Sequence, residues 1–252
     1  MSLPEPYYCE DGITIYHGDC RDVLPRLEAE SVTLLWTDPP YGHSNHDGDF
    51  NARLNEHRGI ESKPIANDGA YEMREVVDFA LTEAARLLRP DCCCCCCCCG
   101  GGGPKPTFAW LAERMDRDGL SFFHSVIWDK VNPGLGWRYR RQHEMVMVAH
   151  RRGGKLAWAS EETPAAPNVV AMMPGRDREH LNEKPLKLVS GFIARHTQPA
   201  DLVLDPFMGS GTTLRAAKDL GRRAIGIELE ERYCEIAVQR LAQMNLDLGD
   251  AA

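Results

Sequence analysis

The sequence predicts an α/β fold built on one largely parallel β-sheet with helices on both faces. Apolar strand-like runs alternate with helical patterns along the chain, which favours strand–helix–strand connections. Strand candidates such as residues 31–41 are apolar at successive positions, as expected for strands that are covered on both faces. With 252 residues, the chain is long enough to bury one large core.

The first half of the chain supplies two strands, a loop and a long helix. Residues 12–19 form a short strand candidate followed by a small helix, and the strand at 31–41 stops at two prolines. Residues 42–70 are polar and show no apolar periodicity, which is typical of a long functional loop. Apolar residues at helical spacing predict a helix over 71–89, and Pro90 is expected to end it.

Eight consecutive cysteines, Cys92 to Cys99, follow this helix and run into four glycines. Successive side chains of a strand point to opposite faces, so neighbouring thiols cannot share one tetrahedral metal ion. Buried thiols behave as small hydrophobic groups. The run alone does not decide between a metal site, a disulfide framework and ordinary secondary structure, but these two properties favour a buried strand.

The second half continues the alternation. The expected elements are a helix at 106–115, strands at 121–128 and 143–150, an irregular segment at 151–183, a helix at 184–197, a strand and Gly-rich turn at 201–213, and a strand and helix at 222–241.

Composition places the chain among ordinary globular proteins, with 43% hydrophobic and 26% charged residues. We expect a cytoplasmic protein without membrane association, because we find no signal peptide and no apolar run of about 20 residues. The adjacent cysteines suit a reduced compartment better than a disulfide framework. The net charge of −8 argues against a general nucleic-acid coat but leaves room for a local basic face.

A basic stretch lies between residues 130 and 155. It carries Lys130, Arg138, Arg140, Arg141, Arg151, Arg152 and Lys155. Such segregation of charge is compatible with an edge that contacts phosphates, and equally with the solvated rim of a hairpin.

The stretch DPFMGSGTT (205–213) has the pattern of a turn that accommodates a nucleotide or nucleoside. Asp205 ends a strand, the glycines allow close backbone approach, and Thr212 or Thr213 can cap the following helix. Glu228, about 20 residues further on, ends the next strand, where an acidic residue can bind ribose hydroxyls. A plain strand-to-helix turn is the alternative.

The stretch TDPPY ends the strand at 31–41 with Asp38, Pro39, Pro40 and Tyr41. A carboxylate, a carbonyl without a local donor and an aromatic ring together suit an exocyclic amino group stacked on the ring. A rigid turn would explain the motif if it stood alone.

These motifs together resemble the amino-methyltransferases that modify DNA bases with S-adenosylmethionine, in the permuted, β-class order. TDPPY matches their catalytic motif, DPFMGSGTT their cofactor loop, and HLNEKP (180–185) the short motif before that loop. The stretch GIELEERYCEIAVQRL (226–241) matches their ribose-binding strand and the helix after it.

The resemblance implies a Rossmann-like methyltransferase fold, circularly permuted, with a seven-stranded, mostly parallel sheet and an antiparallel hairpin. The whole chain, 1–252, would form a single catalytic domain. The strand at 12–19 would take the third position of the family's strand order, and the cysteine strand would lie beside the catalytic strand. Asp19 would lie near the adenine of the cofactor, although it can also cap the helix that follows.

The resemblance also assigns site residues. Asp38, Pro39, Pro40 and Tyr41 would form the target-base site. The expected cofactor-binding residues are Asp19, Asp38, Lys184, Pro185, Asp205, Pro206, Phe207, Gly209, Ser210, Gly211, Thr212, Thr213 and Glu228. A base in a duplex cannot reach such a pocket, so it must be flipped out. In this context we favour DNA contacts for the basic stretch.

The expected activity is transfer of a methyl group from S-adenosylmethionine to N6 of adenine in DNA, leaving S-adenosylhomocysteine. In the resembled family, Asp at the first position of the catalytic motif is associated with adenine and Ser with cytosine N4, which remains the alternative. Cytosine C5 methylation would need a Pro-Cys nucleophile that the sequence lacks, and a protein-glutamine methyltransferase would carry Asn in place of Asp38. An inactive, cysteine-rich metal-binding regulator on the same fold is a further alternative.

Partners and target recognition are less defined by the sequence. We expect DNA as the partner and no metal, since His43, His46 and His57 are irregularly spaced. A homodimer is compatible with the resemblance, as is a cognate restriction endonuclease or none, as in an orphan or phage enzyme. Loop 42–70 and segment 151–183 are the candidate recognition elements. Both are short, which predicts a short or relaxed recognition sequence.

Overall fold

The computed structural model describes residues 2–40, 70–99, 107–134, 138–159, 165–174 and 184–243, with the backbone alone at 70, 94–99 and 107. Tyr41, most of the loop at 42–70, the glycines that follow the cysteines and residues 180–183 of the HLNEKP motif lie outside the described residues.

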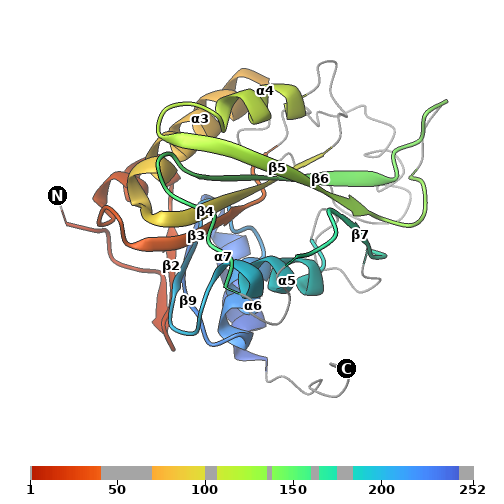
Figure 1. Cartoon of the computed structure of the whole chain (residues 1–252). Helices are drawn as coiled ribbons and strands as arrows, with labels where there is room; N and C mark the ends of the chain where they lie inside the picture. The colour runs from red at the N-terminus through yellow and green to blue at the C-terminus, as the bar shows by residue number, and fades with distance from the viewer. Residues whose placement is uncertain are drawn as a thin grey trace.

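One mixed sheet forms the centre of the molecule (Figure 1). Its spatial order is β1-β2-β9-β8-β3-β4-β6-β5-β7. The strands are β1 (Tyr8–Glu10), β2 (Ile13–His17), β3 (Val32–Thr37), β4 (Leu88–Cys99), β5 (Leu120–Asp129), β6 (His143–Arg151), β7 (Val169–Ala171), β8 (Leu202–Asp205) and β9 (Arg223–Glu228). The five adjacent strands β2, β9, β8, β3 and β4 are parallel to one another. β1 is antiparallel to β2, and β6 is antiparallel to both β4 and β5.

This topology confirms the expected α/β fold, with a parallel core and an antiparallel hairpin. The strand at Ile13–His17 pairs with β9, which places it third in the expected order beside the strand that ends in Glu228. Two three-residue strands, β1 and β7, extend the expected seven strands to nine. Because β7 pairs with β5, part of the segment at 151–183 is ordered as an edge strand rather than irregular.

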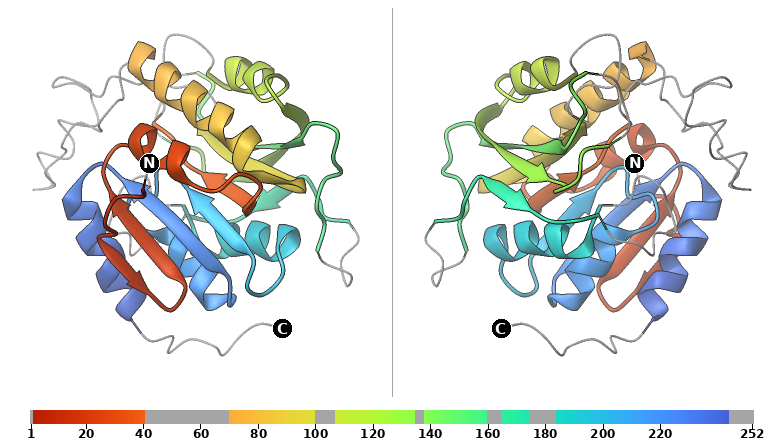
Figure 2. Two further views of the ribbon diagram at one scale, coloured as in Figure 1. Left: turned by 90° about the vertical axis from the view of Figure 1, so that its left-hand side faces the viewer. Right: turned by 90° about the vertical axis from the view of Figure 1, so that its right-hand side faces the viewer.

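Helices cover both faces of the sheet, as the two side views show (Figure 2). The first layer contains α1 (Cys20–Val23), the 3-10 turn η1 (Leu24–Arg26), α3 (Ala70–Leu87) and α4 (Thr107–Arg114). The second contains α5 (Leu186–His196), α6 (Thr212–Asp219) and α7 (Glu231–Ala242). Each layer has its own apolar core against one face of the sheet.

The cysteine run is a strand, as predicted. β4 lies between β3 and β6, with Leu34 opposite Cys93 on one side and His150 opposite Cys93 on the other. Cys92 is 3% exposed and packs in the first layer, whereas Cys93 is fully buried and packs in the second. The two thiols therefore serve as small apolar groups on opposite faces of a covered strand.

The boundary before this strand differs from the prediction. α3 ends at Leu87, and β4 begins at Leu88, so Pro90 lies inside the strand and does not end the helix. Leu88 pairs with Val32 of β3. Sheet pairing therefore fixes this boundary, ahead of the proline.

Candidate functional site

A pocket opens at the edge of the sheet where the parallel strands end. Its walls come from the segments that follow β2, β3, β8 and β9 and from the start of α7. It is lined by Gly18, Asp19, Cys20, Trp36, Asp38, Pro39, Pro40, Val76, Lys184, Val189, Asp205, Pro206, Phe207, Met208, Gly209, Ser210, Thr212, Thr213, Ile227, Glu228, Leu229, Glu230 and Tyr233. In a parallel sheet, this edge is where ligands bind.

Asp205 anchors the Gly-rich turn from inside the pocket wall. Its carboxylate accepts a hydrogen bond from the Thr213 hydroxyl at 2.5 Å and another from the Phe207 amide at 3.1 Å. Burial raises the pKa of Asp205 to about 7, and the nearby charges of Asp38 and Glu228 add to this, while the two hydrogen bonds oppose it. The turn is thus built around a carboxyl group that is costly to ionise.

Glu228 organises the same turn from the neighbouring strand. One carboxylate oxygen accepts from the Gly209 amide at 3.0 Å and the other from the Glu230 amide at 2.8 Å. Burial is the main cause that raises its pKa. Each oxygen can accept a further hydrogen bond, so the predicted contact with ribose hydroxyls is compatible with this arrangement.

The turn requires glycine at Gly211, which has φ +80°. A Cβ atom there would lie 2.7 Å from the Cβ of Ala237 in α7. Gly211 is also the N-cap of α6, without a side-chain cap, so the prediction that Thr212 or Thr213 caps this helix is wrong. The two hydroxyls are used elsewhere: Thr213 donates to Asp205, and Thr212 accepts from Arg240 at 2.7 Å.

The structure confirms Asp19 as a helix cap, while its place near the adenine of the cofactor stays a prediction. Asp19 is the N-cap of α1 and accepts from the Arg21 amide at 2.8 Å. The hydrogen bonds from the Arg21 side chain are the largest of the effects that lower its pKa. It also lines the pocket.

The catalytic candidates lie where β3 enters the pocket. Asp38, Pro39 and Pro40 line it, and Tyr41 lies outside the described residues. The Lys184 ammonium donates to Asp38 Oδ2 at 2.6 Å, joining residues that are 146 positions apart. Among the predicted cofactor residues, Pro185 and Gly211 do not line the pocket; Pro185 instead precedes α5 and accepts hydrogen bonds from its first turn.

The structure also brings in residues that sequence reasoning did not single out. Trp36, Leu229, Glu230 and Tyr233 line the pocket. Tyr233 and its neighbours stand inside the matched 226–241 motif, so the motif contained the signal. Glu144 contacts Lys184. Its sequence signals are that it is an acid within a basic stretch and that it ends RYRRQHE (138–144), on the hairpin that lines the target-base pocket in the resembled family.

The basic stretch is divided between two places. Arg138, Arg140 and Arg141 are exposed in the connection between β5 and β6, at the pocket end of the hairpin, and Arg140 binds the carbonyls of its own loop. Lys130 pairs with Glu144 and stacks on Trp128.

Arg151 and Arg152 lie at the opposite end of β6. Arg151 donates to the carbonyl of Leu88, where β4 begins, and Arg152 to the carbonyl of Leu120, where β5 begins. The structure therefore does not bring these two arginines to the pocket.

Two solved structures are similar to this fold over most of the chain. M1.HpyAVI, solved as a complex with S-adenosylmethionine (SAM), is 25% identical with a TM-score of 0.66, covering 91% of this chain and all of that one. The PvuII DNA methyltransferase, described as cytosine-N4-specific, has a TM-score of 0.74 at 20% identity, covering 96% and 90% of the two chains. The latter likeness shows the fold alone.

Curated relatives agree with this comparison. The type II methyltransferase M2.DpnII of Streptococcus pneumoniae is 26% identical over 96% of this chain and 94% of its own. The type II methyltransferase M.HinfI of Haemophilus influenzae is 26% identical over 94% of this chain and 70% of its own.

A sequence model of the N6/N4 family, described as DNA methylase, matches residues 32–239. That span includes β3 with its DPP motif, the Gly-rich turn and the Glu228 strand. Apart from Gly18, Asp19 and Cys20, the pocket residues lie within this match, which covers most of the chain. The protein belongs to the N6/N4 family of DNA methylases.

Proposed function

We propose that the protein transfers a methyl group from S-adenosylmethionine to the exocyclic N6 of adenine in DNA. The observation that carries the proposal is the Asp38 carboxylate, which stands at the end of β3 in the same pocket as the Gly-rich turn. An acceptor for the target amino group and a site for the methyl donor then lie side by side.

The pocket suits a cationic cofactor. Five carboxylates line it, from Asp19, Asp38, Asp205, Glu228 and Glu230, and Lys184 is the only basic residue among the described lining residues. S-adenosylmethionine carries a sulfonium and an ammonium group against one carboxylate, so its net charge complements this lining. The hydrogen-bonded turn at Gly209 would hold its methionine part, and Glu228 its ribose.

The chain's contribution to the transfer is orientation at Asp38. When bound, the cofactor supplies a methyl group on a positively charged sulfur. A hydrogen bond from the target amino group to Asp38 directs the nitrogen lone pair away from the ring, towards that methyl group. Pro39 and Pro40 restrict the backbone after Asp38, and Tyr41 would stack on the base.

We propose the pocket end of the β5–β6 hairpin as the DNA side, with the target base flipped out. Arg138, Arg140 and Arg141 would contact phosphates there, and loop 42–70 and segment 151–183 would read the sequence. The whole chain would act as one catalytic domain. A homodimer and a cognate endonuclease stay predictions.

Methylation of cytosine N4 is the second candidate function. The PvuII enzyme, which is described as cytosine-N4-specific, shares the fold over most of this chain. The same geometry at Asp38 can orient either exocyclic amine. We favour adenine because of the Asp at position 38.

The test is to incubate the protein with S-adenosylmethionine and mixed-sequence DNA, digest the DNA to nucleosides, and identify the product by chromatography and fragmentation mass spectrometry. Fragmentation is needed because N4- and C5-methylcytosine have equal masses. We expect N6-methyladenine, reduced by about 100-fold or more in Asp38→Ala because the acceptor is lost. N4-methylcytosine alone would move the assignment to the second candidate, and an active Asp38→Ala would remove Asp38 from the mechanism.

A further inference from the structure

Four charged side chains form a continuous chain behind the pocket. Lys184 Nζ lies 2.6 Å from Asp38 Oδ2 and 3.3 Å from Glu144 Oε2. The other oxygen of Glu144 pairs with Lys130. The members come from the end of β3, the segment before α5, the start of β6 and the residue after β5.

The inner members of this network are buried. Lys184 is 6% exposed and Glu144 is 8% exposed. Buried ions are tolerated only when they are paired, and here two cations balance two anions. Burial alone would raise the pKa of Glu144, but the charges of Lys184 and Lys130 outweigh it and hold the pKa below its usual range. Glu144 is therefore an anion at neutral pH.

We propose that Glu144 is a positioning residue for methyl transfer, acting on Asp38 through Lys184. The inference rests on the proposed role of Asp38. The Lys184 ammonium is attracted by the carboxylates of both Glu144 and Asp38. It therefore orients the Asp38 carboxylate but binds it less strongly than it would without Glu144. Asp38 can then accept a hydrogen bond from the target amine at little cost.

Neutralising Glu144 alters this balance in a defined direction. In Glu144→Gln, the Lys184 ammonium loses the charge of Glu144 and keeps that of Asp38. It is then held more strongly by Asp38 and competes with the target amine for that carboxylate. An ammonium with one anionic neighbour also loses its proton more readily than one with two. Asp205, whose pKa is raised in part by the charge of Asp38, is unchanged by the substitution.

The test measures the steady-state rate of methyl incorporation into DNA, whichever base is methylated. Wild type and Glu144→Gln are compared across a series of pH values. We expect kcat to fall about 10- to 100-fold, as for a small misplacement of a reacting group. The KM for DNA and the Kd for cofactor should change by less than about threefold, because the effect lies in the transition state. The alkaline limb of the pH–rate profile should move to lower pH.

Two further variants sharpen the test. Glu144→Asp keeps the charge and should restore the wild-type pH profile. Lys130→Met removes a cation from Glu144, so the alkaline limb should stay or move to higher pH, opposite to Glu144→Gln; this variant also serves if Glu144→Gln does not fold. The matched control is Glu30→Gln, which removes a Glu–Arg ion pair of 2.7 Å at the opposite edge of the sheet and should leave both kcat and the profile unchanged.

The outcomes separate the two proposals. If Asp38→Ala is inactive while Glu144→Gln keeps the wild-type kcat and pH profile, the positioning role is overturned and the proposed function stands. The positioning role is also overturned if kcat of Glu144→Gln falls only in proportion to a fall in its melting temperature and the pH profile does not move. The role of Glu144 would then be structural only. If Asp38→Ala remains active, the proposed function fails first.

Discussion

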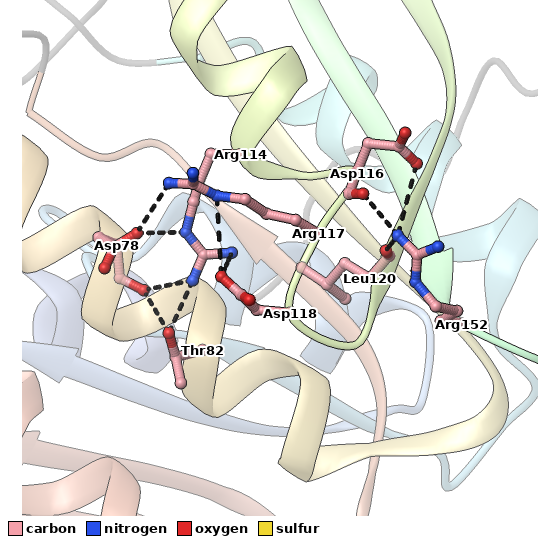
Figure 3. Close-up of polar contacts among 8 residues, drawn as sticks. All are labelled: Asp78, Thr82, Arg114, Asp116, Arg117, Asp118, Leu120 and Arg152. Atoms are coloured by element: carbon pink, nitrogen blue, oxygen red, sulfur yellow. Dashed lines mark hydrogen bonds and ion pairs between the residues drawn. The ribbon is translucent and has the colours of Figure 1, made fainter.

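The two ends of the parallel strands differ in how their charged side chains are arranged. At the pocket, carboxylates from several strand ends converge on a shared space. On the far side, where α4 turns into β5, arginines are paired with carboxylates and carbonyls (Figure 3). Arg114, which is 1% exposed, binds Asp78 and Thr82 of α3, and Arg152 binds the carbonyls of Asp116 and Leu120.

The difference indicates what each region is for. Paired charges that tie helix ends to strand starts stabilise the fold. Burial raises the pKa of both Asp205 and Glu228, and repulsion from neighbouring carboxylates raises it further. Such a site is least stable without its ligand, and a cation would relieve it.

The largest effect on stability is expected on the far side. Arg114→Met should lower the free energy of unfolding by about 3 kcal/mol, because it removes several charge-assisted hydrogen bonds from a buried side chain. Thermal denaturation measures this, and kcat at low temperature should be unchanged. Arg117→Met is the matched control, since Arg117 is 50% exposed and lies 3.8 Å from the same Asp78. Equal losses in the two variants would contradict the importance of burial.

A smaller effect of opposite sign is expected in the pocket. The pKa of Asp205 is about 7 in the folded protein and 3.8 in the reference state. Between pH 3.8 and about 7, the folded protein therefore holds a proton on Asp205 that the unfolded chain has lost. The stability contributed by this group is full below about pH 4 and falls as pH rises through 7. Asp205→Asn should match wild type at low pH and be more stable than wild type at pH 8, as measured by urea denaturation without cofactor.

The same variant should bind S-adenosylmethionine more weakly, because it lacks the carboxylate that the cation favours. Calorimetric titration at pH 8 measures this. A gain in stability without a loss of cofactor affinity would show that the buried charge does not serve binding.

The smallest effect is expected on DNA affinity. It should distinguish the arginines of the β5–β6 connection from those at the opposite end of β6. Arg141→Gln should weaken DNA binding and reduce the slope of log K against log salt by about 1, because one phosphate contact is lost. Arg151→Gln should leave DNA affinity unchanged and cost at most about 1 kcal/mol of stability, as its ion pair with Glu30 is partly exposed. Equal losses of DNA affinity would place DNA on both sides of the molecule.

Local sequence patterns predicted much of the pocket. The DPP motif, the Gly-rich turn and Glu228 each stand at a strand end, and parallel strands bring their ends together. The predicted helix cap at Thr212 or Thr213 was wrong because the two hydroxyls bind the side chains of Arg240 and Asp205 instead. Boundaries such as Leu87–Leu88 were missed because sheet pairing decided them. None of the described helices is both long and apolar enough to cross a membrane.

The sequence by itself predicted the fold class and the residues at the strand ends, because periodicity and turn chemistry are local properties. The cysteine strand belongs to this group, since a run of small apolar side chains suits a covered strand. The order of the parallel strands came from the resemblance to the family. Only the tertiary structure decided which charges meet. Lys184 reaches Asp38 and Glu144, and Arg151 reaches Leu88, because packing joins elements that no local pattern connects.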